Sequence, residues 1–427
     1  MEKTQELPRT VGFWGAALLP VNGMIGSGIF ALPAIMVAAV GNFAPWMMLF
    51  GALLILPLVF VFSILSSKFD KHGGPVLYAG SAFGPFAGFQ AGWARYASGV
   101  VAVAANTQVA IAYLAVLFPV LEDPTLKAAA VIGFIIFTTL VNLVGMRSSV
   151  GTLGLMTAIK IGPLLLLVIV GLATRDPAVG LSLPQFSQFE SVVLLTFYAY
   201  MAFENGTFAA GEMRDPKRNV PLALITTLIG VAGFYMLIIW AYLAIAPQVA
   251  GDESALAAAA GDVMGTAGIV IISVAAAFSI GANTLAGGIV TPRMTYAMAE
   301  QGTLPQAFAH VSKRFHTPDV SILFYGLAAI LFSLWGGFVA LAAASTLSRL
   351  VMYLLSALAL PVIERREEAS SPFWHLPLSV IAALSTFWVA SHASAEAFRM
   401  IGLILLVGTG LYFIAARGAA KRSVGTD

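Results

Sequence analysis

Residues 22–30 read Asn-Gly-Met-Ile-Gly-Ser-Gly-Ile-Phe, and they interrupt an apolar run that is long enough to cross a bilayer. A second interruption, Ala-Phe-Glu-Asn-Gly-Thr at residues 202–207, lies in another run of this kind. Lipid cannot satisfy backbone N–H and C=O groups that are opened at membrane depth, so protein, water or a ligand must pair with them. Two such breaks at corresponding positions are the best sequence indication of a transporter's binding site.

The composition places the whole chain in a membrane. Of its 427 residues, 59% are hydrophobic and only 10% are charged, and the mean hydropathy is +0.91. Soluble domains carry about 25% charged residues. Since a membrane-spanning helix needs about 20 apolar residues, the sequence predicts twelve of them. They cover residues 12–39, 43–67, 86–118, 127–145, 151–173, 190–211, 219–246, 263–290, 319–336, 338–363, 375–393 and 396–416.

The basic residues predict the orientation. With the N-terminus inside, sixteen of the 22 Lys and Arg residues fall on cytoplasmic segments, whereas the outer loops hold only Lys127, Arg175 and Arg399. This bias puts both termini in the cytoplasm and supports an even number of helices. The polar N-terminus runs into a full-length span, so we expect no cleavable signal. The chain has no cysteine, which excludes disulfides and fits a multi-pass protein of the inner (plasma) membrane.

A weak internal repeat relates helices that are five apart. The first and sixth predicted helices are broken, the third and eighth carry Asn106 and Asn283, and the fifth and tenth carry Lys160 and Arg349. Because five is odd, the two halves would have opposite orientations, as in an inverted repeat. The prediction is an all-α polytopic fold forming one transmembrane domain. Its parts are repeat 1 at 11–173, repeat 2 at 189–363 and two peripheral helices at 375–417 within 1–427.

The first break suits a carboxylate. Glycines at 26 and 28 can expose N–H groups at the start of a half-helix, where the helix dipole is positive. The opposite half-helix ends present carbonyls that suit an ammonium group. Both ends together would hold the two charges of an α-amino acid without an ionic side chain. The alternative is that the glycines only allow close helix packing.

Lys160 lies in the middle of the fifth predicted helix, where a charge costs about 3 kcal/mol. We therefore expect it to face the bundle interior. Loss of water disfavours the charged amine, so Lys160 could exchange a proton near neutral pH. It could instead act as a permanent cation that fixes the first break where other transporters bind sodium. A lysine that reaches an interface is the structural alternative.

Glu204 is the only acid in the interior of a predicted span. It could titrate, bind a cationic substrate, or accept hydrogen bonds from N–H groups opened by the break. Tyr198 lies six residues earlier and could wall the pocket. Asn106 and Asn283 are mid-span amides that could contact substrate or join two helices.

Expectations also follow for two arginines and for two of the connections between helices. Arg95 lies near the inner end of the third predicted helix, and we expect it to extend to the interface; Arg349 receives no role. The connection at 68–85 is expected to hold a short interfacial piece, and 291–318 one or two short interfacial helices.

Several chemistries find no support in the sequence. There is no phosphate-binding GxxxxGK[ST] loop, the five histidines are not at metal-ligand spacing, and no nucleophile motif is present. We therefore expect no enzyme activity, cofactor, metal site or nucleic-acid partner.

Several motifs resemble those of the amino acid–polyamine–organocation permeases. Gly-Ser-Gly-Ile-Phe at 26–30 resembles their first-helix signature, and Gly-Glu-Met-Arg-Asp-Pro-Lys-Arg-Asn-Val-Pro at 211–221 resembles the end of their sixth helix. Gly-Gly-Pro at 73–75, Phe-Gly-Pro at 83–85 and Gln-Gly-Thr-Leu-Pro at 301–305 fit as well.

The resemblance implies a LeuT-like fold with ten core helices in a 5+5 inverted repeat plus two peripheral helices. It also implies that the substrate carboxylate lies on Ile25, Gly26, Ser27 and Gly28, and the amine on carbonyls around Ala202, Phe203 and Glu204. Lys160 resembles a lysine that several members place at a sodium site, which implies sodium independence.

We therefore expect a secondary active amino-acid transporter that works by alternating access, linked to protons and independent of sodium. Neutral amino acids are favoured; the alternative is exchange of cationic amino acids or polyamines, with Glu204 contacting the extra charge. A channel or a non-transporting amino-acid receptor are the rivals from other classes. The expected partners are the substrate, protons and the lipid bilayer; symport or antiport and the oligomeric state stay open.

Overall fold

A computed structural model of the chain describes residues 12–69, 74–145, 150–176, 182–208, 215–245, 252–367 and 371–424. Within these ranges all regular secondary structure is helical, and no strand occurs. Each of the twelve predicted spans falls on helix, although the sixth span extends to residue 211 and the structure describes it only to residue 208. The helical fold class is therefore confirmed for the described part of the chain.

The helices follow one another through short connections. Gly41 ends α2 in a left-handed conformation (φ 54°) that favours glycine, and the chain then turns into α3. The α-helices are α1 (Phe13–Met24), α2 (Gly28–Val40), α3 (Ala44–Lys68), α4 (Pro75–Phe83), α5 (Pro85–Leu117), α6 (Pro124–Val144), α7 (Val150–Thr174), α8 (Phe186–Tyr200), α9 (Asn205–Phe208), α10 (Pro216–Ile245), α11 (Ala255–Glu300), α12 (Asp319–Ser333), α13 (Phe338–Arg366), α14 (His375–Ser391) and α15 (Ala395–Val424). The described residues also form the 3₁₀ turns η1 (Gly41–Phe43), η2 (Pro119–Glu122) and η4 (Gln306–Ala309).

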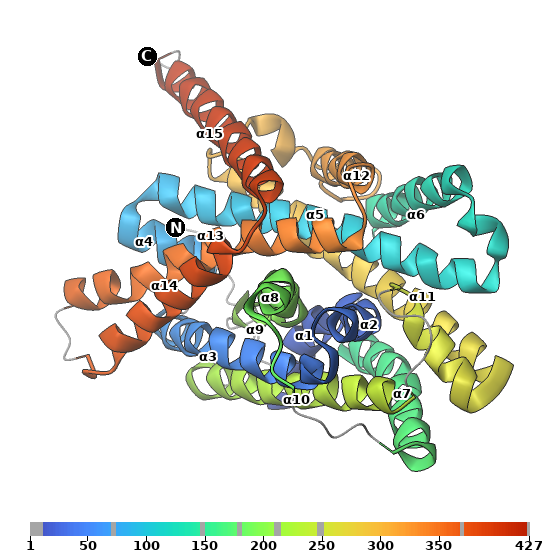
Figure 1. Ribbon diagram of the computed structural model, residues 1–427. Coiled ribbons are helices and arrows are strands. Elements are labelled where there is room, and N and C mark those ends of the chain that lie inside the picture. Colours follow the sequence, from blue (N-terminus) through green and yellow to red (C-terminus); the bar gives the residue numbers. More distant parts are fainter. Residues whose placement is uncertain are drawn as a thin grey trace.

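The interrupted helices lie at the centre of the molecule. Figure 1 shows α1, α2, α8 and α9 surrounded by α3 and α10 on one side and by α5 and α13 on the other. Extensive packing joins α5 to both α13 and α11, and α10 to α3. The last helix, α15, projects from the body toward the C-terminus. This arrangement encloses both breaks within a frame of continuous helices.

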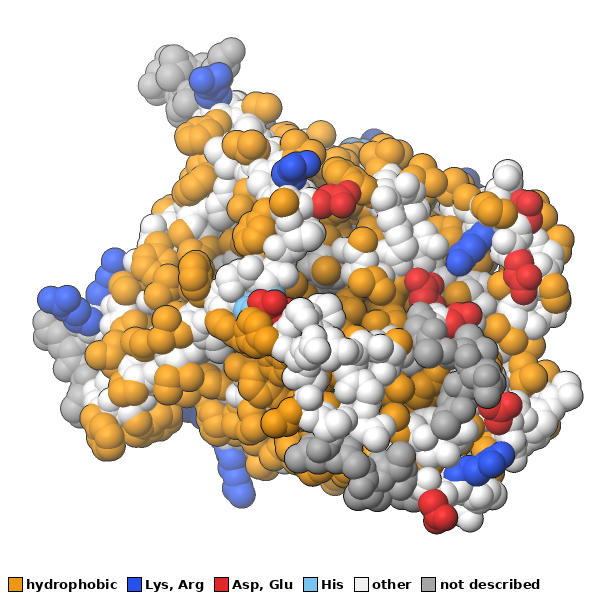
Figure 2. Space-filling model, in the orientation of Figure 1, with side chains coloured by type: hydrophobic (Ala, Val, Ile, Leu, Met, Phe, Trp, Pro, Cys, Tyr) orange, Lys and Arg blue, Asp and Glu red, His pale blue; other side chains and the backbone are white. Residues whose placement is uncertain are grey.

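The outer surface fits a lipid environment. Among the described residues, eight helical segments are long and apolar enough to cross a membrane, and α12 and α14 are shorter apolar helices. Large apolar side chains point outward, as at Phe137 (58% exposed) and Ile229 (64% exposed). Figure 2 shows that hydrophobic side chains cover much of one face and that charged ones are few. Such exposed apolar area is unfavourable in water and favourable in a bilayer.

The connection at 291–318 differs from the prediction. Pro292 lies inside α11, which continues to Glu300 instead of ending near residue 290, and only the short turn η4 is a separate helical piece. A proline inside a membrane helix is tolerated where neighbouring groups re-satisfy the freed backbone. The connection at 68–85 does hold a short helical piece, α4. Gly73 and residues 211–214 of the quoted motifs lie outside the described residues.

Candidate substrate site

The first break separates α1 from α2. Ile25, Gly26 and Ser27 are not helical, and the chain re-enters a helix at Gly28. The amides of residues 26–29 donate to no other described residue, whereas the next two amides both bond to the Ser27 carbonyl. The first N–H groups of a helix have no intrahelical partner, and the dipole makes this end positive. The start of α2 can therefore receive an anionic group.

The second break separates α8 from α9. Residues 201–204 form a turn in which Ala202 has a left-handed φ of 74°, an unfavourable conformation for a residue with a Cβ. The carbonyls of Ala202, Phe203 and Glu204 accept the amides of residues 205–207. Those of residues 199–201, one turn earlier, accept no described backbone amide. The end of α8 therefore holds acceptors that suit an ammonium group.

Gly23, which was not among the predicted site residues, lets the two breaks approach each other. A Cβ built on Gly23 would lie 2.7 Å from Asn205 Nδ2 and 2.9 Å from the Cβ of Ala202. Both distances are too short for a real side chain, so only glycine fits there. The close approach of the interrupted helices thus depends on this residue.

A polar cluster joins the first break to α5, α8 and α11. The Ser27 hydroxyl donates to Asn106 Oδ1 at 2.5 Å, and the Tyr198 hydroxyl lies 3.2 Å from both. The Asn106 amide donates to Asn283 Oδ1 at 3.1 Å, and Asn283 in turn donates to the Asn22 carbonyl at 2.7 Å. The structure therefore brings together four predicted site residues, one from the first break and three from α5, α8 and α11. The two asparagines therefore join α5 to α11, which is the second of the two roles expected for them.

Lys160 reaches the first break from α7. Its side chain is 1% exposed, and Nζ donates to the Ile25 carbonyl at 3.1 Å. This carbonyl belongs to the open end of α1, where helix carbonyls lack intrahelical partners. The expectation that Lys160 faces the bundle interior is confirmed, and the interfacial alternative is wrong.

A cavity of about 440 Å³ lies between the two breaks. Small-molecule sites range from about 300 to 1,000 Å³, so this volume suits an amino acid. Asn106, Tyr198 and Gly28 line one end of the cavity. The rest of the lining comes from the C-terminal half of α1, from residues 95–103 of α5, from the N-terminal half of α7 and from the C-terminal half of α11. The cavity thus extends from the breaks toward one side of the bundle only.

The predicted site residues divide into two groups. Eight of them line the cavity: Gly26, Ser27, Gly28, Asn106, Lys160, Tyr198, Ala202 and Asn283. Ile25, Phe203 and Glu204 do not line it. Phe203 is instead fully buried against Phe62 and Tyr353, with ring centroids 5.3 Å apart in each case.

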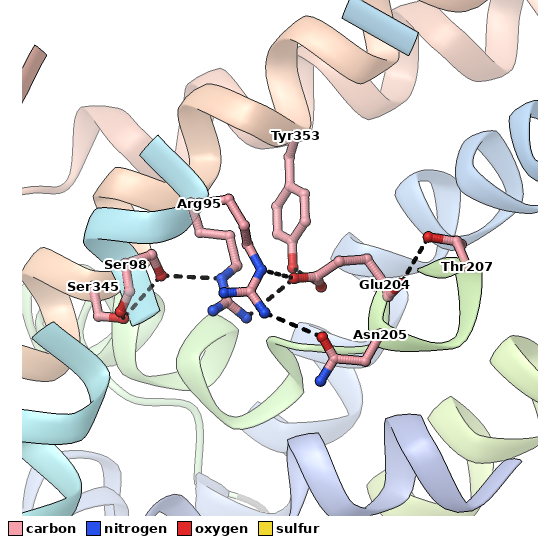
Figure 3. A network of polar contacts seen from close by, with 8 residues as sticks. Arg95, Ser98, Glu204, Asn205, Thr207, Ser345 and Tyr353 are labelled. Atoms are coloured by element: carbon pink, nitrogen blue, oxygen red, sulfur yellow. Dashed lines mark hydrogen bonds and ion pairs between the residues drawn. The ribbon is translucent and has the colours of Figure 1, made fainter. Parts of the chain in front are cut away.

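Glu204 is the centre of a buried charge network, shown in Figure 3. Its side chain is 0% exposed, and Oε1 lies 3.0 Å from Arg95 Nε and 3.3 Å from Arg349 Nη1. The Tyr353 hydroxyl donates to Oε2 at 2.8 Å. These three partners come from α5 and α13, so the network ties the second break to the surrounding frame.

The structure corrects one expectation for the arginines. Arg95 is 6% exposed and faces Glu204 and Asn205, so the prediction that it extends to the interface is wrong. Arg349, for which no role was predicted, contacts Glu204 and donates to Ser98 Oγ at 3.0 Å. Both arginines also line the cavity. For Arg349, the position in the middle of a span and the cost of a buried charge indicate that the side chain needs a partner. The sequence does not show that this partner is Glu204.

Comparison with known proteins gives the class. Residues 11–408 match the family model described as "Amino acid permease". The serine/threonine exchanger SteT of Bacillus subtilis is 26% identical over 423 residues, which cover 94% of this chain and 95% of that protein. The cadaverine/lysine antiporter of Escherichia coli is 29% identical over 293 residues, which cover 66% of this chain and 60% of that protein.

An interrupted-helix site enclosed by apolar helices defines an integral membrane transport protein. The chain belongs to the amino acid permease family. It is a multi-pass membrane protein that transports amino acids and is not an enzyme.

Proposed function

We propose that the chain is a secondary carrier that holds the main chain of an amino acid between the two breaks. The substrate carboxylate binds the open amides at the start of α2, and the ammonium group binds the carbonyls at the end of α8. One observation carries this proposal: both sets of unpaired backbone groups belong to breaks that line the same cavity. Ser27, Asn106, Tyr198 and Asn283 close the site around the substrate.

The transport cycle is alternating access within a LeuT-like fold. We assign residues 11–173 and 189–363 to two inverted repeats and residues 375–417 to peripheral helices. We also propose that the protein lies in the inner membrane with both termini in the cytoplasm. The one-sided cavity supports this cycle, since a carrier must close one side while the other is open. In this orientation the cavity faces the cytoplasm. The interrupted helices would move against the frame formed by α3, α5, α10 and α13.

We propose that Lys160 carries the coupled proton and takes the place of a bound sodium ion, so that transport does not depend on sodium. Its amine supplies a positive charge to the open end of α1, where a bound cation would otherwise satisfy the same carbonyl. Glu204 is less suited to carry a proton, because two arginines and a tyrosine hydroxyl hold its carboxylate. We therefore place Glu204 as a brace for the second break.

The side-chain class is partly constrained by charge. The alternative of a cationic substrate put its extra charge against Glu204, but that carboxylate is covered by Arg95 and Arg349. The two relatives support exchange as the mode of transport. Their substrates differ in charge, so they do not identify the substrate of this protein. We propose that the substrates are amino acids with neutral or negative side chains.

Counterflow in proteoliposomes tests this function. Vesicles loaded with an unlabelled amino acid should accumulate the labelled one, with saturation, whereas empty vesicles should not. A screen of the twenty amino acids by thermal shift selects the probe, because binding to the folded state alone raises apparent stability. Replacing sodium by choline at fixed pH and potential should leave uptake unchanged. Flux without saturable counterflow would indicate a channel, and binding without flux a receptor.

A further inference from the structure

We infer that the substrate carries a second negative charge, as in a dicarboxylic amino acid, and that Arg95 and Arg349 receive its side-chain carboxylate. This inference rests on the proposed function, because it assumes that the main chain lies at the two breaks. It adds the chemistry of the side chain, which the breaks themselves do not specify.

The charges around the cavity do not balance. Among the described residues, three cations line it, Arg95, Lys160 and Arg349, and no acid does. Within the part of the chain that the structure describes, Glu204 is the only carboxylate in contact with these cations. Three positive charges against one negative charge leave an excess of two. All four side chains are at least nine-tenths buried, so water compensates this excess poorly.

Both arginines also have N–H donors that are not used in hydrogen bonds to described residues. Glu204 Oε1 is close to both guanidinium groups but makes no well-aligned hydrogen bond with either. Arg95 uses Nη2 on Asn205, and Arg349 uses Nε on Ser98. Neither Nη1 of Arg95 nor Nη2 of Arg349 has an acceptor among the described residues. Guanidinium groups with open N–H donors pair strongly with carboxylates.

The position of the arginines fits a side chain rather than the main chain. A Cβ built on Gly99 would lie 3.3 Å from Arg95 Nη1, so the guanidinium group sits beside Gly99. Asn106 follows seven residues later on α5, which is about 10 Å along the helix axis. The Arg95 guanidinium group therefore lies about two helical turns from Asn106 along α5, and Arg349 contacts the same oxygen of Glu204. A substrate whose carboxylate binds at the first break would reach the arginines with its side chain, and a longer acidic side chain reaches further.

Each class of substrate changes the balance differently. A zwitterion with a neutral side chain leaves the excess of two positive charges unchanged, and a cationic side chain raises it to three. An acidic side chain lowers it to one and supplies an acceptor for the open N–H groups. Glutamate should therefore bind better than glutamine, which has the same length and an uncharged amide.

The first test measures binding of L-glutamate, L-aspartate, L-glutamine and L-lysine to the full-length protein in nanodiscs by calorimetry at pH 7. We expect glutamate to bind at least ten times more tightly than glutamine and more tightly than aspartate, and lysine not to bind. Glutamine binding as tightly as glutamate, or any binding of lysine, would overturn the inference while leaving the carrier function intact. If no amino acid of any class binds, the proposed function itself fails.

A substitution of Arg349 tests whether this residue is responsible for the preference for glutamate over glutamine. Arg349→Met removes one cation, while Glu204 keeps Arg95 as a partner at 3.0 Å. The preference for glutamate over glutamine should fall at least tenfold, with glutamine affinity little changed. Arg365→Met on the same helix is the matched control, since Arg365 is exposed and should leave the preference unchanged. An unchanged preference in Arg349→Met would overturn the assignment. If that variant does not fold, Arg349→Lys, which keeps the charge, should retain the preference.

Discussion

Replacement of Glu204 by glutamine should destabilise the protein more than any other single change in the charge network. The substitution keeps the shape of the side chain and removes its charge, so Arg95 and Arg349 lose their shared counter-ion at 3.0 and 3.3 Å. Removing one partner of a buried ion pair costs about 3–5 kcal/mol. Because glutamine retains an oxygen acceptor, we expect the lower end, about 3 kcal/mol.

Tyr353→Phe is the matched control for this prediction. It preserves both ion pairs and removes one hydrogen bond of 2.8 Å to a charged acceptor, which costs about 1.5–3 kcal/mol. The free energy of unfolding is measured by SDS titration in mixed micelles. A Glu204→Gln protein within about 0.5 kcal/mol of the wild type would refute the reasoning.

A double variant separates the network from a general loss of packing. Combining Glu204→Gln with Arg349→Gln removes the acid together with one of its cations, so only Arg95 is left without its partner. Residues in one network are not additive, with coupling of about 0.5–3 kcal/mol. We expect the double variant to be more stable than the sum of the two single changes predicts. Strict additivity would show that the three side chains do not act as a unit.

Three further predictions concern transport. Lys160→Ala should still bind substrate and lose the pH dependence of uptake, since its amine is the proposed proton carrier; a wild-type pH profile would contradict that role. Gly26→Val should abolish substrate binding with the fold intact, because the new side chain starts 3.6 Å from Asn283 Oδ1 inside the cavity. Gly162→Val, at a glycine with open space around it, is the control and should bind normally. The chain has no cysteine, so Ala286→Cys in the cavity lining provides a unique thiol. A membrane-impermeant maleimide should label it from the cytoplasmic side, and excess substrate should slow the reaction; labelling only from outside would contradict the orientation.

The helices and both breaks could be predicted from the sequence because each depends on a local pattern. Apolar runs determine where helices lie, and the glycines at 26 and 28 interrupt one run within a few residues. The second predicted break, at residues 202–207, overlaps the turn observed at residues 201–204, whereas Asn205 and the residues after it form α9. Lys160 was expected in the interior because a charge in the middle of a long span has no short route to water.

The charge network could not be predicted because it is a tertiary arrangement. Arg95, Glu204 and Arg349 are far apart in the chain and meet only when α5 and α13 pack beside the second break. The sequence gives the depth of Arg95 along its helix but not the direction in which the side chain points, and depth alone suggested the interface. The free carbonyls of α8 are a similar case, since the turn at residues 201–204 determines which carbonyls remain unpaired.

The most direct test of the central claim asks whether both main-chain charges of the substrate are needed. Inhibition of counterflow is measured with the best amino-acid substrate, its α-methyl ester and its N-acetyl derivative. The ester lacks the carboxylate charge proposed to bind at the start of α2, and the acetyl compound lacks the ammonium charge proposed to bind at the end of α8. We predict that the amino acid inhibits and that each derivative loses at least tenfold in apparent affinity. Equal inhibition by either derivative would contradict binding of the main chain between the two breaks.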